Sequence, residues 1–266
     1  MKKVCVALGS GGPRGLAHIG VLKVLNRYGI TIEMVAGSSI GALIGGAYVV
    51  FNSVEKVEKL ALSTDMKMVL GVLFDPTLNL GLVKGKKVKK FIEEKVGDPL
   101  IEDLPKPFFP VATNFSTGDS VVFTNGRLSD LIRASISIPF VFQPIRYKGM
   151  LLTDGGLSMQ VPVMPLKERG CKIVIAVNLA ENAFDKKDYF VNGLVRSPVG
   201  IYKVAFNSIG ILEINLAREN CRSADVVISP DVRNVGLDSF WKPKDVIEQG
   251  EVAAEKSIEK ILSLIE

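Results

Sequence analysis

The stretch 4-VCVALGSGGPRGLAHIGVL-22 joins an apolar run to a glycine-rich turn and then to a helical pattern. Residues 4–8 are apolar, residues 9–12 have almost no side-chain bulk, and apolar positions after Gly15 recur at helical spacing. This order predicts a strand that turns sharply into a helix. Such a turn leaves backbone N–H groups free to bind negative charge, helped by the positive end of the helix dipole.

Strand and helix patterns alternate along the rest of the 266 residues. The predicted strands are residues 3–8, 32–36, 108–112, 120–124, 150–153, 172–177 and 225–228. The predicted helices are residues 15–28, 40–51, 84–96, 128–135, 194–219 and 245–265. Several strands are apolar on both faces, which is typical of strands covered by helices on both sides. We therefore expect one α/β domain over residues 1–266, a three-layer α/β/α sandwich with a central, mostly parallel sheet.

The cysteines and the apolar runs bear on the compartment. Cys5, Cys171 and Cys221 are far apart and odd in number, so we expect free thiols, mostly in the core, in a reducing compartment. No secretory signal is visible, and no apolar run reaches the roughly 18 residues of a transmembrane helix. These features favour a cytoplasmic protein, with peripheral membrane association as the other expectation.

The net charge of +5 and the pI of about 9.0 suit an anionic surface, either nucleic acid or lipid headgroups. No nucleic-acid-binding motif is present in the sequence, so we expect no nucleic-acid partner. The densest basic cluster, residues 84–90, follows the apolar stretch 66–82. Together they form a candidate contact with an anionic membrane. The alternative is a core segment beside the solvated face of a helix. The oligomeric state is not indicated.

A second turn of small residues, 37-GSSIG-41, lies between the predicted strand 32–36 and the predicted helix 40–51. This is a G-x-S-x-G pattern in the strand-to-helix context of a nucleophile elbow. The sharp turn requires neighbours without side chains at Gly37 and Gly41, and it would project the hydroxyl of Ser39 at the start of a helix. The alternative is an ordinary helix start with a serine N-cap.

A serine nucleophile needs a base, and the chain has one histidine, His18. His18 precedes Ser39, whereas α/β-hydrolases place histidine last, and it sits among apolar residues at helical spacing. We interpret it as a packed, hydrogen-bonded helix residue. A carboxylate is the next choice, and Asp154 follows an apolar strand and precedes Gly155 and Gly156. The alternative is a turn aspartate in a hairpin.

Three motifs in this order resemble the patatin-like phospholipase family: 10-SGGPRG-15, 37-GSSIG-41 and 154-DGG-156. The stretches "GLAHIGVLKVL" and "IRASISIPFVFQPI" are also similar to family members. The resemblance spans roughly residues 3 to 178, and nothing specific is matched after about residue 180. Two positions depart from the family pattern. Ser10 replaces a glycine, and Pro13 has no N–H to donate.

The resemblance implies a Ser–Asp pair that hydrolyses acyl esters of lipids without a metal or organic cofactor. By position it implies Ser39 as nucleophile, Asp154 as base, and Gly11 and Gly12 as oxyanion donors. We expect the oxyanion to meet the backbone amides of residues 10–12. The expected site residues are Ser39, Asp154, Ser10, Gly11, Gly12, Arg14, Gly15, Gly37, Gly41, Gly155 and Gly156.

Two other functions compete with this hypothesis. Ser10, Gly12 and Gly15 nearly match a dinucleotide fingerprint, with Glu33 about where a ribose-binding acid is expected. That interpretation leaves the second and third motifs unexplained. The other alternative is a lipid-binding protein on the same fold that performs no catalysis.

Overall fold

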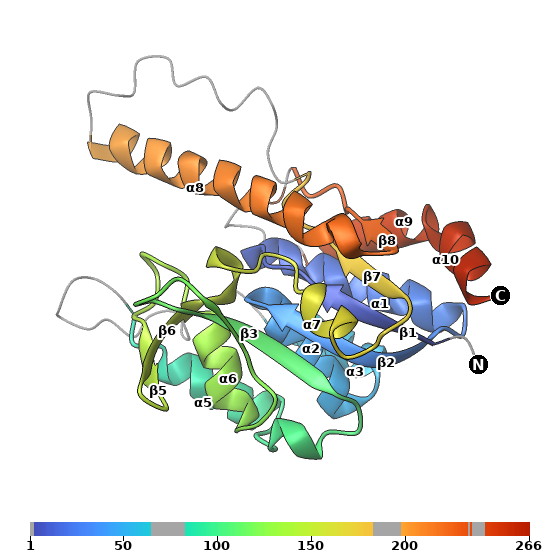
Figure 1. Ribbon diagram of the computed structural model, residues 1–266, viewed down its shortest axis with the longest axis horizontal. Coiled ribbons are helices and arrows are strands. Elements are labelled where there is room, and N and C mark those ends of the chain that lie inside the picture. The colour runs from blue at the N-terminus through green and yellow to red at the C-terminus, as the bar shows by residue number, and fades with distance from the viewer. Residues whose placement is uncertain (1–2, 65–82, 183–197, 234, 236–242) are drawn as a thin grey trace.

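The computed structural model describes residues 3–64, 83–182, 198–233, 235 and 243–266, which form one sheet covered by helices (Figure 1). The strands are β1 Lys3–Leu8, β2 Thr31–Ser38, β3 Phe108–Asn114, β4 Ser120–Val122, β5 Ile145–Tyr147, β6 Met150–Asp154, β7 Val174–Val177 and β8 Val226–Ile228. Their order across the sheet is β5-β6-β3-β2-β1-β7-β8, and β4 pairs with β3.

The strands from β3 through β2, β1 and β7 to β8 are all parallel, and β4, β5 and β6 add antiparallel pairings at the β3 side. The expectation of a mostly parallel sheet is therefore confirmed. Leu8 pairs with Gly37 on one side and with Val177 on the other, so the carboxyl ends of β1, β2 and β7 meet at one edge. The two small-residue turns that follow β1 and β2 consequently lie side by side.

Helices cover both faces of the sheet, as the alternation of strand side chains requires. Val4, Val6 and Leu8 face a core that also contains α1 and α2, whereas Cys5 and Ala7 face a second core with residues of α7 and α8. The helices are α1 Ala17–Arg27, α2 Ile40–Phe51, α3 Val54–Ser63, α5 Lys86–Lys95, α6 Leu128–Ser135, α7 Met164–Lys167, α8 Pro198–Asn220, α9 Pro243–Glu255 and α10 Ile258–Ile265. This is the three-layer α/β/α arrangement that was expected.

The predicted elements differ from the observed ones at a few places. Three elements were not predicted: helix α3, the short strand β5 and the short helix α7. The predicted helix 245–265 is interrupted between α9 and α10, where Ser257 Oγ donates to the carbonyl of Ala253. A serine that bonds back to its own helix competes with the helical ladder, which explains the interruption.

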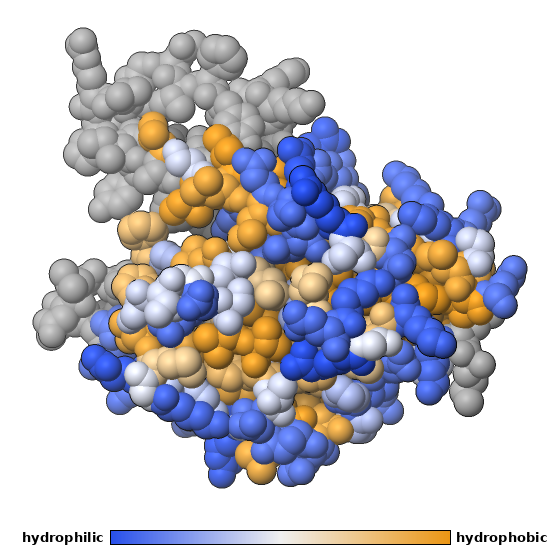
Figure 2. Space-filling view, in the orientation of Figure 1, coloured by the Kyte–Doolittle hydropathy of each residue, from blue (hydrophilic) through white to orange (hydrophobic). Residues whose placement is uncertain are grey.

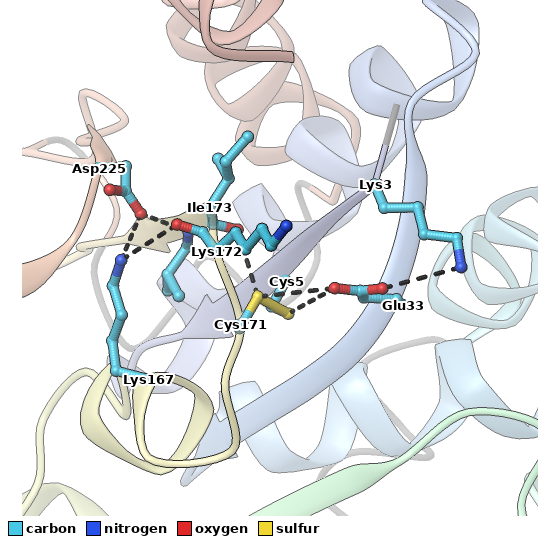
Figure 3. Close-up of a disulfide and its surroundings, with 9 residues drawn as sticks. Lys3, Cys5, Glu33, Lys167, Cys171, Lys172, Ile173 and Asp225 are labelled. Atoms are coloured by element: carbon cyan, nitrogen blue, oxygen red, sulfur yellow. Dashed lines mark hydrogen bonds and ion pairs between the residues drawn. A yellow bond between two sulfur atoms is a disulfide. The ribbon is translucent and has the colours of Figure 1, made fainter. Parts of the chain in front are cut away.

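The expectation of three free thiols is wrong for two of the cysteines. Cys5 on β1 and Cys171, just before β7, form a disulfide (Figure 3). Cys221 is a buried free thiol. The two cysteines are 166 residues apart in sequence. They meet because β1 and β7 are neighbouring parallel strands, with Cys5 paired to Val174. Sequence spacing carries no information on this pairing.

The apolar stretch 66–82, a candidate part of the membrane contact, lies outside the described residues. Within the described residues, no helix combines the length and the apolar character needed to span a bilayer.

Candidate active site

Ser39 occupies a sharp turn between β2 and α2. Its backbone has φ 54° and ψ −123°, a region that non-glycine residues rarely adopt and that costs about 1–3 kcal/mol. Side chains are excluded on both sides of it. A Cβ on Gly37 would meet the backbone of Gly41, and a Cβ on Gly41 would meet the carbonyl of Leu8. The turn thus has the geometry that the G-x-S-x-G pattern predicts.

The hydroxyl of Ser39 is hydrogen-bonded to a carboxylate 115 residues away. Ser39 Oγ lies 2.6 Å from Asp154 Oδ2, and the other carboxylate oxygen, Oδ1, accepts the N–H of Gly156 at 2.8 Å. Both side chains are buried, with Ser39 2% and Asp154 5% exposed. Asp154 reaches this place because it ends β6, which pairs with β3 next to β2. A serine hydroxyl in this position can transfer its proton directly to the carboxylate.

Burial raises the pKa of Asp154 to about 7. Loss of hydration disfavours the charged form of the carboxyl group and raises its pKa. The hydrogen bonds from Ser39 and Gly156 favour the carboxylate and lower the pKa, but by less than burial raises it. The charge of Glu213, on α8, raises the pKa further. A carboxyl group with a pKa near neutrality is suited to accept and release a proton at neutral pH.

The glycine-rich turn after β1 lies beside this pair, but its amides are not equivalent. The N–H of Ser10, which was expected to help bind an oxyanion, donates instead to the carbonyl of Gln160 at 2.9 Å. For the N–H groups of Gly11 and Gly12 we find no acceptor among the described residues. Gly12 has φ 56°, a left-handed conformation that favours glycine. Gly11 and Gly12 are thus the amides that can bind negative charge here.

Arg14 and Gly15 connect the turn to other parts of the molecule. A Cβ on Gly15 would meet the side chain of Ile40, so glycine allows the turn to pack against the start of α2. Arg14 Nε donates to the carbonyl of Val235 at 3.3 Å. Burial lowers the pKa of Arg14, and the charge of Glu213 opposes this change. Arg14 therefore links the turn to the C-terminal third of the chain.

His18 does not contact Ser39. It is fully buried in α1, and its Nε2 donates to the carbonyl of Gly9 at 2.8 Å. Burial lowers the pKa of His18 to about 4, so the imidazole is neutral at pH 7. The interpretation of His18 as a packed, hydrogen-bonded helix residue is confirmed.

The glycines after Asp154 allow close approach of the neighbouring segments. A Cβ on Gly155 would meet the carbonyl of Val111, and one on Gly156 would meet Gln160 and Ser10. The Asp154 loop and the glycine-rich turn are therefore in direct contact. Gln160 was not predicted to belong to the site, because only the fold brings its carbonyl to Ser10.

Metal-ligating side chains come together at one place among the described residues: Cys5, Glu33 and Cys171. The two sulfur atoms are bonded to each other, so they are not available as thiolates. This group also lies toward the amino ends of β1 and β2, whereas Ser39 follows the carboxyl end of β2. It takes no part in the candidate site.

The sequence pattern of one protein family, described as patatin-like phospholipase, matches residues 6–167. The chain belongs to the patatin-like phospholipase family. The matched segment contains the glycine-rich turn, the turn at Ser39 and the Asp154 loop. The crystal structure of VipD from Legionella pneumophila has a TM-score of 0.53 and 14% sequence identity to this chain. The match covers 98% of this chain and 67% of VipD, and it bears on the fold alone.

Several relatives of this patatin-like chain are longer than it is. An uncharacterized NTE family protein of Mycobacterium bovis is 36% identical over 212 residues, which are 76% of this chain and 58% of that protein. The lysophospholipase NTE1 of Lodderomyces elongisporus is 33% identical over 183 residues, 66% of this chain and 12% of that protein. The chain thus spans a little over half of the first relative and a small part of the second.

Proposed function

We propose that this chain is a serine acyl hydrolase that cleaves carboxylic ester bonds of lipids, of the phospholipase A or lysophospholipase type. The observation that carries the proposal is the 2.6 Å hydrogen bond between Ser39 Oγ, in its strained turn, and the buried carboxylate of Asp154. Membership of the patatin-like phospholipase family supports it, and the name of the fungal relative favours lysophospholipids as substrates.

In the proposed reaction Ser39 Oγ attacks the ester carbonyl carbon while its proton passes to Asp154. The amides of Gly11 and Gly12 bind the oxyanion of the tetrahedral intermediate. When this intermediate collapses, Asp154 returns the proton to the leaving alcohol, and an acyl-serine remains. Water then attacks the acyl-serine with Asp154 as base, which releases the fatty acid and restores Ser39.

Exposed apolar side chains that follow Asp154 in sequence, or that precede Glu213, whose charge acts on Asp154, support a lipid substrate. Leu157, three residues after Asp154, is exposed, as are Ile211 and Leu212 next to Glu213 on α8. Figure 2 shows hydrophobic surface over part of α8 and on the face below it. An acyl chain that leaves the bilayer needs such a surface, because contact between the acyl chain and water is unfavourable.

The test is labelling with a fluorophosphonate probe, which reacts with an activated serine, combined with hydrolysis of a p-nitrophenyl ester. Ser39→Ala should abolish both signals and keep the circular dichroism spectrum of the parent. Full turnover by this variant would refute the proposal. An unlabelled parent protein that still binds vesicles would instead favour a lipid-binding protein without catalysis, and tight NAD binding without hydrolysis would favour a nucleotide-binding protein. Lyso- and diacyl-lipids of several chain lengths then define the substrate.

A contact with anionic lipid through the basic cluster is part of the same proposal. Lys86, Lys87 and Lys90 of α5 are exposed, and Lys86 and Lys87 lie in its first turn. Lys89 pairs with Asp130, and Lys90 pairs with Glu94. Charge reversal at Lys86 and Lys87 should weaken binding to anionic vesicles at low salt and spare hydrolysis of a soluble ester. Unchanged vesicle binding would exclude this surface.

A further inference from the structure

The C-terminal end of α6 contacts the turn that holds Ser39. Ser135, the last residue of α6, is completely buried. Its Oγ donates to the carbonyl of Val111 on β3 at 2.5 Å and accepts the backbone N–H of Ser39 at 2.9 Å. Because the bond to Val111 fixes the hydroxyl proton, the lone pairs of Ser135 Oγ are directed toward the Ser39 amide.

The same chain segment also holds the residue that pairs with Ser39. The carbonyl of Ser137 accepts the backbone N–H of Asp154 at 3.1 Å and the hydroxyl of Thr153 at 2.9 Å. Arg133, itself buried, fixes this segment, because its Nη1 donates to Ser137 Oγ at 2.7 Å. Ser135 and Ser137, which are two residues apart, thus hold the backbones of Ser39 and Asp154, which are 115 residues apart.

We infer that Ser135 is a positioning residue for the reaction proposed above, on which this inference rests. A backbone at φ 54° persists only where its surroundings enforce it. The glycines at 37 and 41 permit this conformation but do not enforce it. The hydrogen bond from the Ser39 amide to Ser135 Oγ does, and it keeps Ser39 Oγ at 2.6 Å from the carboxylate. A small displacement of the nucleophile costs much of its reactivity.

The experiment compares Ser135→Ala with Ser129→Ala. Ser129 is a matched control, because it lies on α6 and is equally buried, but its Oγ bonds to Glu93. We expect Ser135→Ala to lower kcat on a soluble ester about tenfold or more, with KM within about twofold of the parent value. Amide hydrogen exchange at Ser39 should become faster in Ser135→Ala and stay unchanged in Ser129→Ala.

The outcomes separate this inference from the proposed function. A Ser135→Ala variant with the parent's kcat and the parent's exchange rate at Ser39 would overturn the positioning role. Equal losses of kcat in the two variants, in proportion to their loss of thermal stability, would also overturn it, since the effect would then be structural. If the parent protein itself hydrolyses no ester, the proposed function fails, and the exchange rate at Ser39 still decides whether Ser135 holds the turn.

Discussion

The imidazole of His18 lies 2.8 Å from the carbonyl oxygen of Gly9, at the start of the glycine-rich turn, and it makes no hydrogen bond to Ser39. His18→Gln should therefore lower the free energy of unfolding by about 1–3 kcal/mol, because a buried hydrogen bond and its packing are disturbed. Hydrolysis by the folded variant should stay within about threefold of the parent rate. Urea denaturation and a p-nitrophenyl ester assay measure the two effects. A well-folded His18→Gln as inactive as Ser39→Ala would make histidine the base.

Removal of the carboxylate should be as damaging as removal of the nucleophile. In the proposed pair Asp154 accepts the proton itself, so Asp154→Asn and Ser39→Ala should each lower kcat about 10⁴-fold or more. The double variant should be within about threefold of either single variant, because the two groups act as a unit. Independent, multiplicative losses in the double variant would show that the two side chains act in separate steps.

The rate should follow the ionisation of Asp154. Only its carboxylate form accepts a proton, so kcat/KM should rise with pH around a midpoint near the pKa of about 7. Since the charge of Glu213 raises this pKa, Glu213→Gln should move the midpoint to lower pH. Glu219→Gln, on the same helix but exposed and paired with Arg222, is the control and should leave the midpoint in place. A midpoint that both variants leave unchanged would argue against control by Asp154.

The same pKa has a consequence for stability. The pKa of Asp154 in the folded protein, about 7, lies above the value of 3.8 of an unperturbed aspartate. The folded state thus binds the proton more tightly, and this contribution to stability is complete below about pH 4 and is lost as pH rises through 7. Asp154→Asn removes this titration. The free energy of unfolding of the variant, relative to that of the parent, should therefore increase by up to about 4 kcal/mol between pH 4 and pH 8. Chemical denaturation at several pH values measures this difference. A gain that is the same at every pH would contradict it.

Reduction of the disulfide should destabilise the fold. Cys5 and Cys171 close a long loop, and a cross-link of this kind contributes about 2–4 kcal/mol. A reductant should lower the denaturation midpoint of the parent and of Cys221→Ser, but not that of Cys171→Ser. Three reactive thiols in the unreduced, denatured parent would show that the bond is absent in solution.

The short-range features of the site could be predicted from the sequence, because their causes are local. The turn at Ser39 needs glycine at 37 and 41 for steric reasons that hold in any fold, and helices α2 and α6 have the predicted bounds. Asp154 was identified because it follows a strand and precedes two glycines. Helix α3 also had a local signal that was missed, since Ser53 Oγ accepts the N–H of Lys56 as an N-cap.

The remaining features depend on contacts between segments that are distant in sequence. The pairing of β1 with β7 brings Cys5 to Cys171, and the approach of the Asp154 loop places the carbonyl of Gln160 against the amide of Ser10. Ser135 reaches the Ser39 amide because α6 packs on β3 beside β2. The sequence by itself determined which residues could react, because steric limits and residue chemistry act locally. Only the tertiary structure decided which groups hold them in place, because hydrogen bonds between distant segments form only when the sheet order is set.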